Sequence, residues 1–510
     1  MSNCNPWHHF QQRYSCVHGS LRERQEKWLM NCLRANQNSL YGKEKGFAEI
    51  ATIEAFQQCV PVVEYETLAP LIERIGQGQQ NVLFCESVQA FERTGGSHSG
   101  GKLIPYSARG LADFRHALTR WLGDTIREHQ LTQGHAYWAL SPVATRQENT
   151  CGGVPVGAGD ALYLGENNLA AFIRLSAVPL SVGNVEDMAD WQLLTLNYLL
   201  RSHDLRLISV WSPAFLTSLL TGLQTRQQTL LALLAHGGDI AGHTLAPDAQ
   251  ALSRYQHYLL SSDTRQLWPE LAVISCWTDA ASQSLADEMM QHFSGVCLQP
   301  KGLLSTEAVI SVPDKHGLPT LCVDSNFYEF IADDGVISLA DELVVGAEYR
   351  VIVTTNSGLY RYQTGDRVKC TGESEGIPGL RFTGRDGVYS DLVGEKLTEP
   401  FVINCLASLR GFAALAPDIA TPGYVLLLDS ALRERNVPYL NDIEERLRSN
   451  PQYCYARRLD QLAPLRCQFI DNPADRYLRW RQRQGKRLGD IKIPAIFTAD
   501  EWRGTFQTGV

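Results

Sequence analysis

Hydrophobic and polar residues follow two different spacings along this chain. Apolar residues within positions 111–126 recur near the helical period, and Ser107 precedes them as a candidate N-cap. Residues 205–211 form a short apolar run typical of a buried strand, and residues 213–223 return to the helical pattern. Strands that alternate with helices predict a mostly parallel α/β core.

The pattern changes after residue 346. Residues 348–355 are strand-like, Asn356-Ser357-Gly358 is a turn sequence, and residues 359–370 resume the extended pattern. This hairpin predicts an antiparallel subdomain that follows the α/β core.

Glycine and proline mark the next part of the chain as rich in turns, over residues 372–379. The sequence Gly384-Arg385-Asp386-Gly387 is the predicted domain boundary. We therefore expect a large domain over residues 1–384 and a small α/β lid over residues 385–510. A half-exposed helix is expected near residues 443–447.

Composition limits the classes of protein to consider. A length of 510 residues suits two or three domains, and 44% hydrophobic residues suffice for a core. The net charge of -9 argues against a nucleic-acid partner. Thirteen scattered cysteines without a C-x-x-C pair predict reduced thiols and a cytoplasmic protein. No leader is visible, and no apolar run reaches the roughly 18 residues that span a bilayer, so we expect no membrane partner.

The stretch from Glu92 to Lys102 carries the most specific chemistry. It contains four glycines and three hydroxyl residues, and it ends on a lysine. Such a loop lets backbone N–H groups approach a polyphosphate closely and adds one cation. The loop therefore predicts nucleoside triphosphate chemistry.

Two other interpretations of this loop remain open. Gly96 and Gly101-Lys102 fit the P-loop spacing, but Leu103 stands where that motif needs Ser or Thr. Pro105 also suits poorly the helix that begins there in a P-loop. The second alternative is a glycine-rich turn without a ligand.

Four segments, in order along the chain, resemble motifs of one family. They are Thr94-Gly95-Gly96-Ser97 with Lys102-Leu103-Ile104-Pro105-Tyr106, Leu303-Leu304-Ser305-Thr306-Glu307, Tyr360-Arg361-Tyr362-Gln363-Thr364-Gly365-Asp366, and Phe382-Thr383-Gly384-Arg385. Together they resemble the bacterial branch of the auxin-responsive acyl-acid amido synthetases. That family belongs to the superfamily of acyl-CoA synthetases, adenylation domains and luciferases. The resemblance covers roughly residues 40–500.

This resemblance implies an α/β fold. A large adenylate-forming domain with mixed sheets and an antiparallel subdomain would precede the small C-terminal α/β lid. It also implies ATP and Mg²⁺ as cofactors, a carboxylic acid as substrate, and an amine or amino acid as acceptor.

The resemblance further assigns roles to residues around the loop. Lys102 would act on the β- and γ-phosphates. The other phosphate-binding candidates are Thr94, Gly95, Gly96, Ser97 and His98. His98 is bulkier than the small residues typical there, so it either donates to a phosphate or faces solvent.

The later motifs would complete the nucleotide site. Glu307 would hold Mg²⁺, and Ser305 and Thr306 would lie along AMP, although Ser-Thr-Glu is also an ordinary helix start. Asp366 would accept the ribose hydroxyls, and otherwise forms a turn after its glycine. Arg385 would touch the ribose or a phosphate; the alternative is a solvated arginine.

The C-terminal part offers two lysines. Lys492, in Ile491-Lys492-Ile493-Pro494, resembles the mobile catalytic lysine of the superfamily, and Lys396 is a second candidate. For both, an ordinary exposed lysine is the alternative. The sequence names no base that deprotonates the amine.

Several positions depart from the family pattern. Gly95 replaces the usual Ser, Ser99 replaces Gly, and Leu303 replaces an aromatic residue that commonly stacks on adenine. These departures leave the acyl substrate open. An amide-forming ligase is the leading hypothesis; an acyl-CoA ligase and a non-catalytic nucleotide-binding relative are the alternatives.

Overall fold

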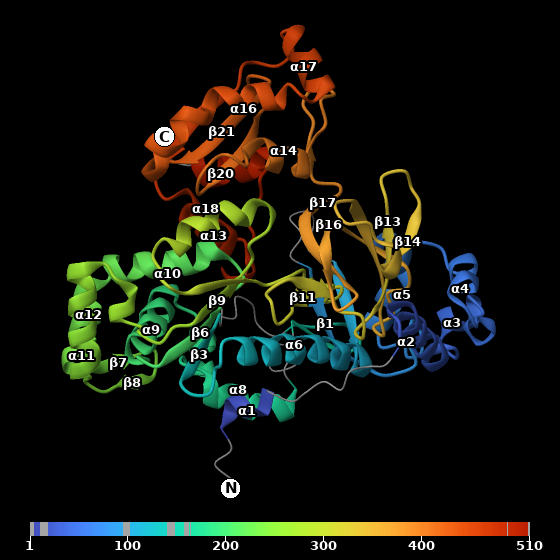
Figure 1. The fold of residues 1–510 in the computed structure, drawn as a ribbon, viewed down its shortest axis with the longest axis horizontal. Coiled ribbons are helices and arrows are strands. Elements are labelled where there is room, and N and C mark those ends of the chain that lie inside the picture. The colour runs from blue at the N-terminus through green and yellow to red at the C-terminus, as the bar shows by residue number, and fades with distance from the viewer. Residues whose placement is uncertain are drawn as a thin grey trace. The chain divides into compact units, whose positions relative to one another are not determined.

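The computed structural model describes residues 5–10, 19–94, 102–139, 148–157, 163, 165–486 and 488–507. Two compact units interleave along the chain (Figure 1). Unit 1 comprises residues 1–133, 145–175 and 300–383, and unit 2 comprises residues 134–144, 176–299 and 384–510. The predicted division into domains 1–384 and 385–510 stays a prediction. Among the described residues, no helix has the length and apolar character needed to cross a membrane.

Hydroxyl side chains set where the main helices of unit 1 begin. Ser20 and Glu23 form a capping box, in which each side chain accepts the backbone N–H of the other. Ser107 Oγ accepts the N–H of Gly110 at 3.0 Å, which confirms the expected cap. The helices are α1 Pro6–Phe10, α2 Leu21–Asn36, α3 Leu40–Glu44, η1 Phe47–Glu49, α4 Ile53–Cys59, α5 Tyr65–Gly76, α6 Ala108–Glu128, α8 Glu166–Leu175 and η5 Ala340–Glu342.

A mixed four-stranded sheet in unit 1 contains the strands on both sides of the glycine-rich loop. Its strands are β1 Val88–Arg93, β2 Leu103–Ser107, β4 Glu148–Asn149 and β5 Pro155–Val156. Their order is β2-β1-β5-β4, with β1 antiparallel to β2 and parallel to β5. Strand β2 therefore lies at an edge of this sheet.

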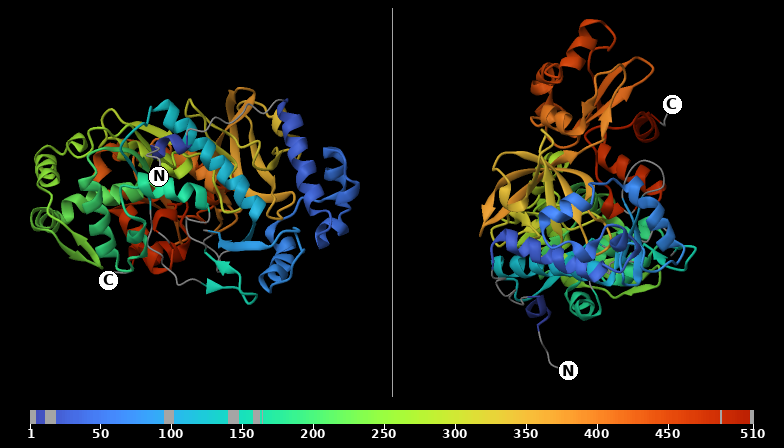
Figure 2. Two further views of the ribbon diagram at one scale, coloured as in Figure 1. Left: turned by 90° about the horizontal axis from the view of Figure 1, so that it is seen from below. Right: turned by 90° about the vertical axis from the view of Figure 1, so that its right-hand side faces the viewer.

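The second sheet of unit 1 is the predicted antiparallel one. Its strands are β11 Ser311–Pro313, β12 Pro319–Leu321, β13 Phe327–Ile331, β14 Ile337–Leu339, β15 Glu348–Thr354, β16 Tyr362–Ser374 and β17 Ile377–Arg385. Their order is β11-β12-β17-β16-β15-β13-β14, and the expected β15–β16 hairpin is present. The helices of residues 21–76 lie beside this sheet in both views of Figure 2.

One expectation about this sheet is wrong in its extent. The turn within residues 372–379 is confined to Glu375-Gly376, because β16 extends to Ser374 and β17 begins at Ile377. A Cβ on Gly379 would lie 2.8 Å from the side chain of Leu318, so this glycine allows close packing within a strand.

Unit 2 contains the predicted parallel α/β core. Its four-stranded sheet has the strands β3 His135–Trp138, β6 Leu205–Ser209, β9 Val273–Cys276 and β10 Cys297–Pro300, in the order β10-β9-β6-β3. Strand β6 pairs in parallel with β3 and with β9. The helices and the small hairpin around it are η2 Leu180–Asn184, α9 Met188–Arg201, α10 Pro213–Thr225, α11 Gln227–His236, β7 Gly238–Ile240, β8 His243–Leu245, α12 Ala249–Ser261, η3 Thr264–Gln266, η4 Ala280–Ser282 and α13 Gln283–Met290.

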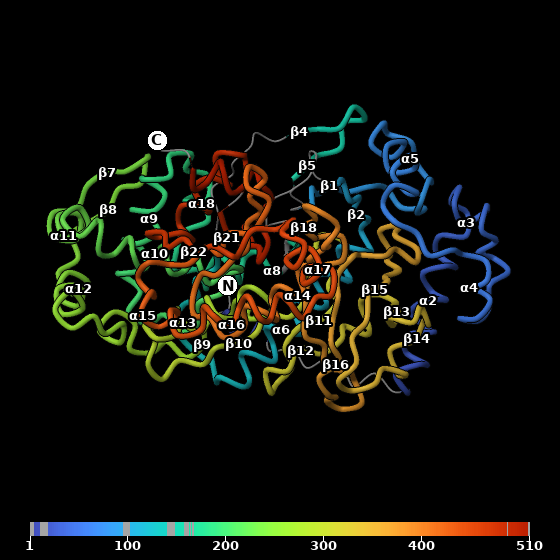
Figure 3. The backbone as a smooth tube through the Cα atoms, turned by 90° about the horizontal axis from the view of Figure 1, so that it is seen from above, coloured from blue at the N-terminus to red at the C-terminus, as the bar shows by residue number. Residues whose placement is uncertain are grey.

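The C-terminal part of unit 2 is a small α/β arrangement (Figure 3). Its strands are β18 Tyr389–Ser390, β19 Leu397–Thr398, β20 Ala413–Asp418, β21 Gly423–Asp429 and β22 Arg466–Ile470. Its helices are α14 Glu399–Leu406, η6 Ser430–Leu432, α15 Arg433–Asn436, η7 Val437–Tyr439, α16 Leu440–Leu447, α17 Pro451–Arg458, α18 Pro473–Arg483, η8 Leu488–Asp490, α19 Ala499–Trp502 and η9 Arg503–Gln507. The expected helix around residues 443–447 is α16.

The period of two along β21 explains how its sheet is buried on both faces. Val425 and Leu427 pack into one apolar core, while Leu426 and Leu428 pack into another. Successive side chains of a strand point to opposite faces, so an uninterrupted apolar run fits this position.

Candidate active site

The two ends of the glycine-rich loop are fixed by backbone geometry. Thr94 N–H donates to the Lys102 carbonyl at 2.9 Å, and Lys102 N–H donates to Thr94 Oγ1 at 3.1 Å. The threonine side chain thus closes the hairpin where the loop leaves and returns. Four predicted phosphate-binding residues, Gly95, Gly96, Ser97 and His98, lie outside the residues that the structure describes.

The chain after Lys102 distinguishes the two nucleotide-loop interpretations. Residues Leu103–Ser107 form β2, and helix α6 begins only after Ser107. A P-loop lysine instead stands at the beginning of its helix. The P-loop alternative is therefore wrong, and the loop joins two antiparallel strands.

Glu307 stands on a tight turn. Ser305 N–H donates to the Ala308 carbonyl at 3.0 Å, and Ala308 N–H donates to Ser305 Oγ at 3.3 Å. Thr306 and Glu307 occupy the two central positions, so this segment is no helix start. Only 6% of Glu307 is exposed, and a buried carboxylate requires positive charge or hydrogen-bond donors nearby.

Tyr106, on strand β2, ties this turn to that strand, a role that no sequence motif indicates. Its hydroxyl donates to the Thr306 carbonyl at 2.5 Å. Burial raises the pKa of Tyr106 well above its ordinary value, and the charges of Glu92 and Glu307 add to the increase. Both carboxylates therefore act on the same buried phenol, from β1 and from the turn.

The Tyr-Arg-Tyr segment is mostly structural. Tyr360 stacks on Tyr41 with ring centroids 5.2 Å apart, and its hydroxyl donates to the Leu83 carbonyl. Arg361 forms a two-pronged ion pair with Glu329, with both N–O distances 2.8 Å. Asp366 follows on β16, also buried, and its backbone N–H donates to the hydroxyl of Thr364.

Arg385 and Lys492 belong to unit 2 and share a neighbour, Glu399. Burial raises the pKa of Glu399, while the N–H of Ala495 at 3.1 Å and the charges of Lys492 and Arg385 oppose the increase. The second lysine candidate, Lys396, is exposed, directly precedes β19 and has φ of 44°.

Lys492 also meets an aromatic pair where the parallel strands end. Its Nζ lies 4.6 Å from the Trp277 ring centroid, and the rings of Trp277 and Trp211 are 5.8 Å apart. Trp277 directly follows the carboxyl end of β9, and Trp211 lies two residues after the carboxyl end of β6. Ligands of parallel α/β sheets bind at this edge. Lys492 thus lies at a chemically plausible position, whereas Lys396 has no such neighbourhood described.

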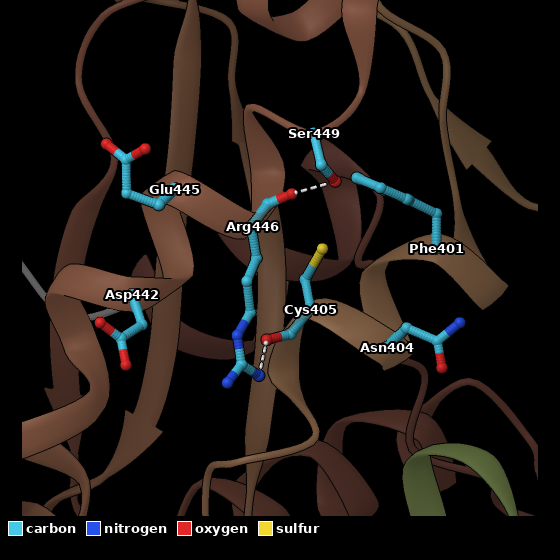
Figure 4. Close-up of a pocket in the computed structure, with 7 residues that line it drawn as sticks. All are labelled: Phe401, Asn404, Cys405, Asp442, Glu445, Arg446 and Ser449. Atoms are coloured by element: carbon cyan, nitrogen blue, oxygen red, sulfur yellow. Dashed lines mark hydrogen bonds between the residues drawn. The ribbon is translucent and has the colours of Figure 1, made fainter.

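A hollow of about 530 Å³ lies in the C-terminal part of unit 2, between α14 and α16 (Figure 4). Arg446 Nη1 donates to the Cys405 carbonyl at 3.3 Å, and Asp442 and Glu445 line the same hollow. None of the predicted site residues lines it, so it is separate from the candidate nucleotide site.

The site residues thus divide between the units. Unit 1 contains Thr94, Lys102, Ser305, Thr306, Glu307 and Asp366, and unit 2 contains Arg385 and Lys492. Within the described residues, no group of three or more His, Cys, Asp or Glu side chains could hold a metal ion.

Comparison with known families gives two matches in order. The profile described as "GH3 family N-terminal domain" matches residues 15–298, and "GH3 family central domain" matches residues 319–385. The first alone covers more than half of the chain.

Curated relatives match across most of their length. A "Probable indole-3-acetic acid-amido synthetase GH3.12" of Oryza sativa is 24% identical, over 74% of this chain and 71% of the relative. A "Jasmonoyl--L-amino acid synthetase JAR6" of Nicotiana attenuata is also 24% identical, with the same coverage.

Solved structures share the fold. "GH3.15 acyl acid amido synthetase" matches with a TM-score of 0.79 and 18% identity, over 95% of this chain and 93% of that one. A "2-Hydroxyisobutyryl-CoA Ligase (HCL)" matches with a TM-score of 0.57 and 10% identity, over 96% and 95%. The expected α/β fold with mixed and antiparallel sheets is confirmed.

Proposed function

We propose that this chain, which belongs to the GH3 family, is an ATP-dependent ligase that joins a carboxylic acid to an amine. The observation that most favours this function is the match to the family's N-terminal and central domains. The names of its relatives, which are amido synthetases, favour amide formation over other uses of an adenylate.

The first half-reaction activates the acid. A carboxylate oxygen attacks the α-phosphorus of ATP, the bond to the β-phosphate oxygen breaks, and pyrophosphate leaves. Both reactants are anionic, so the site must supply positive charge and donors. We assign Lys102 and Thr94 to the β- and γ-phosphates, with Gly95, Gly96, Ser97 and His98 as further predicted contacts.

The second half-reaction transfers the acyl group. A neutral amine nitrogen attacks the carbonyl carbon of the acyl adenylate, the amide bond forms, and AMP leaves while the nitrogen loses a proton. We propose an amino acid as acceptor and Lys492 as a catalytic residue in unit 2. Asp366 is assigned to the ribose hydroxyls, Arg385 to the ribose or a phosphate, and Ser305 and Thr306 to AMP.

Mg²⁺ fits the residues around the Ser305–Ala308 turn. Glu307 is buried and close enough to Tyr106 to affect its pKa, as is Glu92. Mg²⁺ prefers one or two carboxylates together with phosphate oxygens, which suits the small number of protein ligands. Bound there, it would neutralise charge on the departing pyrophosphate. We assign the metal contact to Glu307.

Several finer assignments belong to the same proposal. The departures at Gly95, Ser99 and Leu303 favour the bacterial branch of the family. Leu303 is buried, so its side chain packs in the core.

The free thiols among the described cysteines favour a cytoplasmic location, and the acidic net charge favours a protein without nucleic-acid partners. A lid domain over residues 385–510 is retained as a proposal.

An acyl-CoA ligase is the second candidate, favoured by the fold match to the 2-hydroxyisobutyryl-CoA ligase. Pyrophosphate exchange into ATP, measured across a panel of carboxylic acids without acceptor, tests the shared first step. Amino acids or coenzyme A are then added separately. Amide product supports the proposal; thioester alone supports the second candidate.

Glu307→Gln tests the site itself. We expect exchange to fall about a hundred-fold or more, as when one charge-stabilising group of an active site is removed. Glu49→Gln is the matched control, because Glu49 is an exposed carboxylate in unit 1. Unchanged exchange in Glu307→Gln would contradict the metal assignment.

A further inference from the structure

Tyr65 contacts both the lysine that ends the glycine-rich loop and the residue after it. Its hydroxyl accepts the N–H of Leu103 at 3.0 Å and donates to the Leu103 carbonyl at 3.1 Å. The Nζ of Lys102 lies 5.2 Å from the centroid of the Tyr65 ring. One side chain therefore contacts both the backbone and the ammonium at this point.

The hydroxyl contacts follow from the position of β2 in its sheet. Leu103 is opposite Arg93 on β1, and among the residues that the structure describes no strand pairs with the other side of β2. In an antiparallel pair, alternate residues direct both backbone groups away from their partner strand. The Tyr65 hydroxyl forms hydrogen bonds with both the N–H and the carbonyl of Leu103, as a neighbouring strand would do.

The segment before Tyr65 is held by strand β16. Val63 N–H donates to the Arg361 carbonyl at 3.0 Å, and Gln363 N–H donates to the Val63 carbonyl at 2.9 Å. The Arg361 guanidinium also donates to the carbonyls of Gln57 and Val60. Strand β16 is the strand that carries Asp366. A continuous set of contacts thus runs from the ribose candidate to the phosphate candidate within unit 1.

We propose that Tyr65 is a positioning residue that holds the Lys102 ammonium and the start of β2 in place for the triphosphate of ATP. This inference rests on the proposed function, because that function brings a triphosphate to Lys102. Lysine has a flexible four-carbon stem, and the negative face of an aromatic ring restricts its charged end. The ring attracts the cation while N–H donors stay available for phosphate oxygens.

Burial of the phenol agrees with its double role. Burial raises the pKa of Tyr65 above its ordinary value, so the hydroxyl keeps its proton at neutral pH and can donate while it accepts.

A tyrosine that only stabilised the fold would behave differently from a positioning residue. Loss of stability alone would weaken ATP and AMP binding alike. Displacement of the Lys102 ammonium would weaken the binding of ATP more than that of AMP, because AMP lacks the β- and γ-phosphates. The ratio of the two affinities therefore separates the roles.

The test measures binding of Mg²⁺-ATP and of AMP by calorimetry in Tyr65→Phe and Tyr65→Leu. The phenylalanine variant keeps the ring and loses the hydroxyl contacts, and we expect ATP affinity to fall about two- to ten-fold. The leucine variant also loses the cation–π contact, which contributes a further factor of about two to five. AMP affinity should stay within about two-fold in both.

The matched control is Tyr41→Phe. Tyr41 has Lys45 Nζ 5.5 Å from its ring centroid in the same unit, but has no contact with the loop described. ATP affinity in this variant should equal that of the wild type.

Equal losses of ATP and AMP, or wild-type ATP affinity in both Tyr65 variants, would overturn the inference. If the leucine variant fails to fold, the phenylalanine variant decides. A wild-type chain that binds ATP but supports exchange with no acid would refute the proposed function alone, since the binding comparison still decides the role of Tyr65. A wild-type chain that binds no ATP would overturn both.

Discussion

Replacing Glu329 by Gln should strongly destabilise the antiparallel sheet of unit 1. The Glu329 side chain is fully buried, the Arg361 side chain is 5% exposed, and two N–H···O contacts of 2.8 Å join them. Glu329 also accepts the Gln57 amide at 2.8 Å. Glu329→Gln would leave a buried guanidinium without its counter-charge and turn an N–H donor toward it.

The magnitude follows from these contacts. Hydrogen bonds to charged groups contribute about 1.5–3 kcal/mol each, so two of them give about 3–6 kcal/mol. Breaking a buried ion pair at one partner costs about 3–5 kcal/mol, which agrees. Replacing both partners, in Glu329→Leu with Arg361→Met, should recover only part of this loss: no charge is left buried, but the carbonyls of Gln57 and Val60 lose the guanidinium donor.

The assay is urea unfolding followed by hydrogen exchange of peptides from β13 and β15, because these report on the sheet that contains the pair. Asp333→Asn is the control: Asp333 is 73% exposed and pairs with Arg367 at 2.8 Å, so its loss should cost at most about 1 kcal/mol. A loss in Glu329→Gln no larger than in Asp333→Asn would refute the reasoning.

Three further predictions follow from other parts of the chain. Burial raises the pKa of Asp113 from 3.8 to about 7, so between these pH values the folded state binds more protons than the unfolded state and its stability falls as pH rises. Asp113→Asn should remove up to about 1.4 kcal/mol of this decrease per pH unit, when the free energy of unfolding is measured from pH 4.5 to 7.5. Parallel curves of unfolding free energy against pH for the wild type and the variant would contradict this prediction. Gly302 has φ of 76°, and an added Cβ would lie 2.3 Å from the backbone carbonyl oxygen of Ser311. Gly302→Ala should therefore lower both the melting temperature and the rate of pyrophosphate exchange. Wild-type values for both would exclude strain at this position. Lys492→Ala should change tryptophan emission, through Trp277, and reduce amide formation, whereas Lys396→Ala should do neither. The reverse order would transfer the catalytic assignment to Lys396.

Much of the fold could be predicted because its determinants are local. The helical spacing after Ser107, the apolar run that became β6 and the turn at Asn356-Ser357-Gly358 all depend on neighbouring residues. The stretch at residues 372–379 was misjudged for the opposite reason. Gly379 serves tight packing against Leu318, and the sequence around it cannot show that distant contact.

The candidate site was only partly predictable for the same reason. Lys102 and Glu307 lie in segments that match recognisable sequence motifs, so the sequence identifies them as candidates. Tyr65 lies 38 positions from Leu103, and Tyr106 lies 200 positions from Thr306. No local pattern distinguishes these tyrosines from core residues, and only the fold brings each to its carbonyl partner.

The Tyr-Arg-Tyr segment shows why a motif should not be treated as one functional unit. Tyr360 stacks in the core, and Arg361 neutralises a buried carboxylate. Only Asp366, on the strand β16 that follows them, has the chemistry expected for the ribose. The arginine still bears on the site, because its carbonyl and guanidinium hold the segment that ends at Tyr65. If Lys102 binds phosphate as proposed, structural residues of this motif would influence that binding without touching the nucleotide. A substitution there should be interpreted through the position of Lys102 before a direct role is assigned.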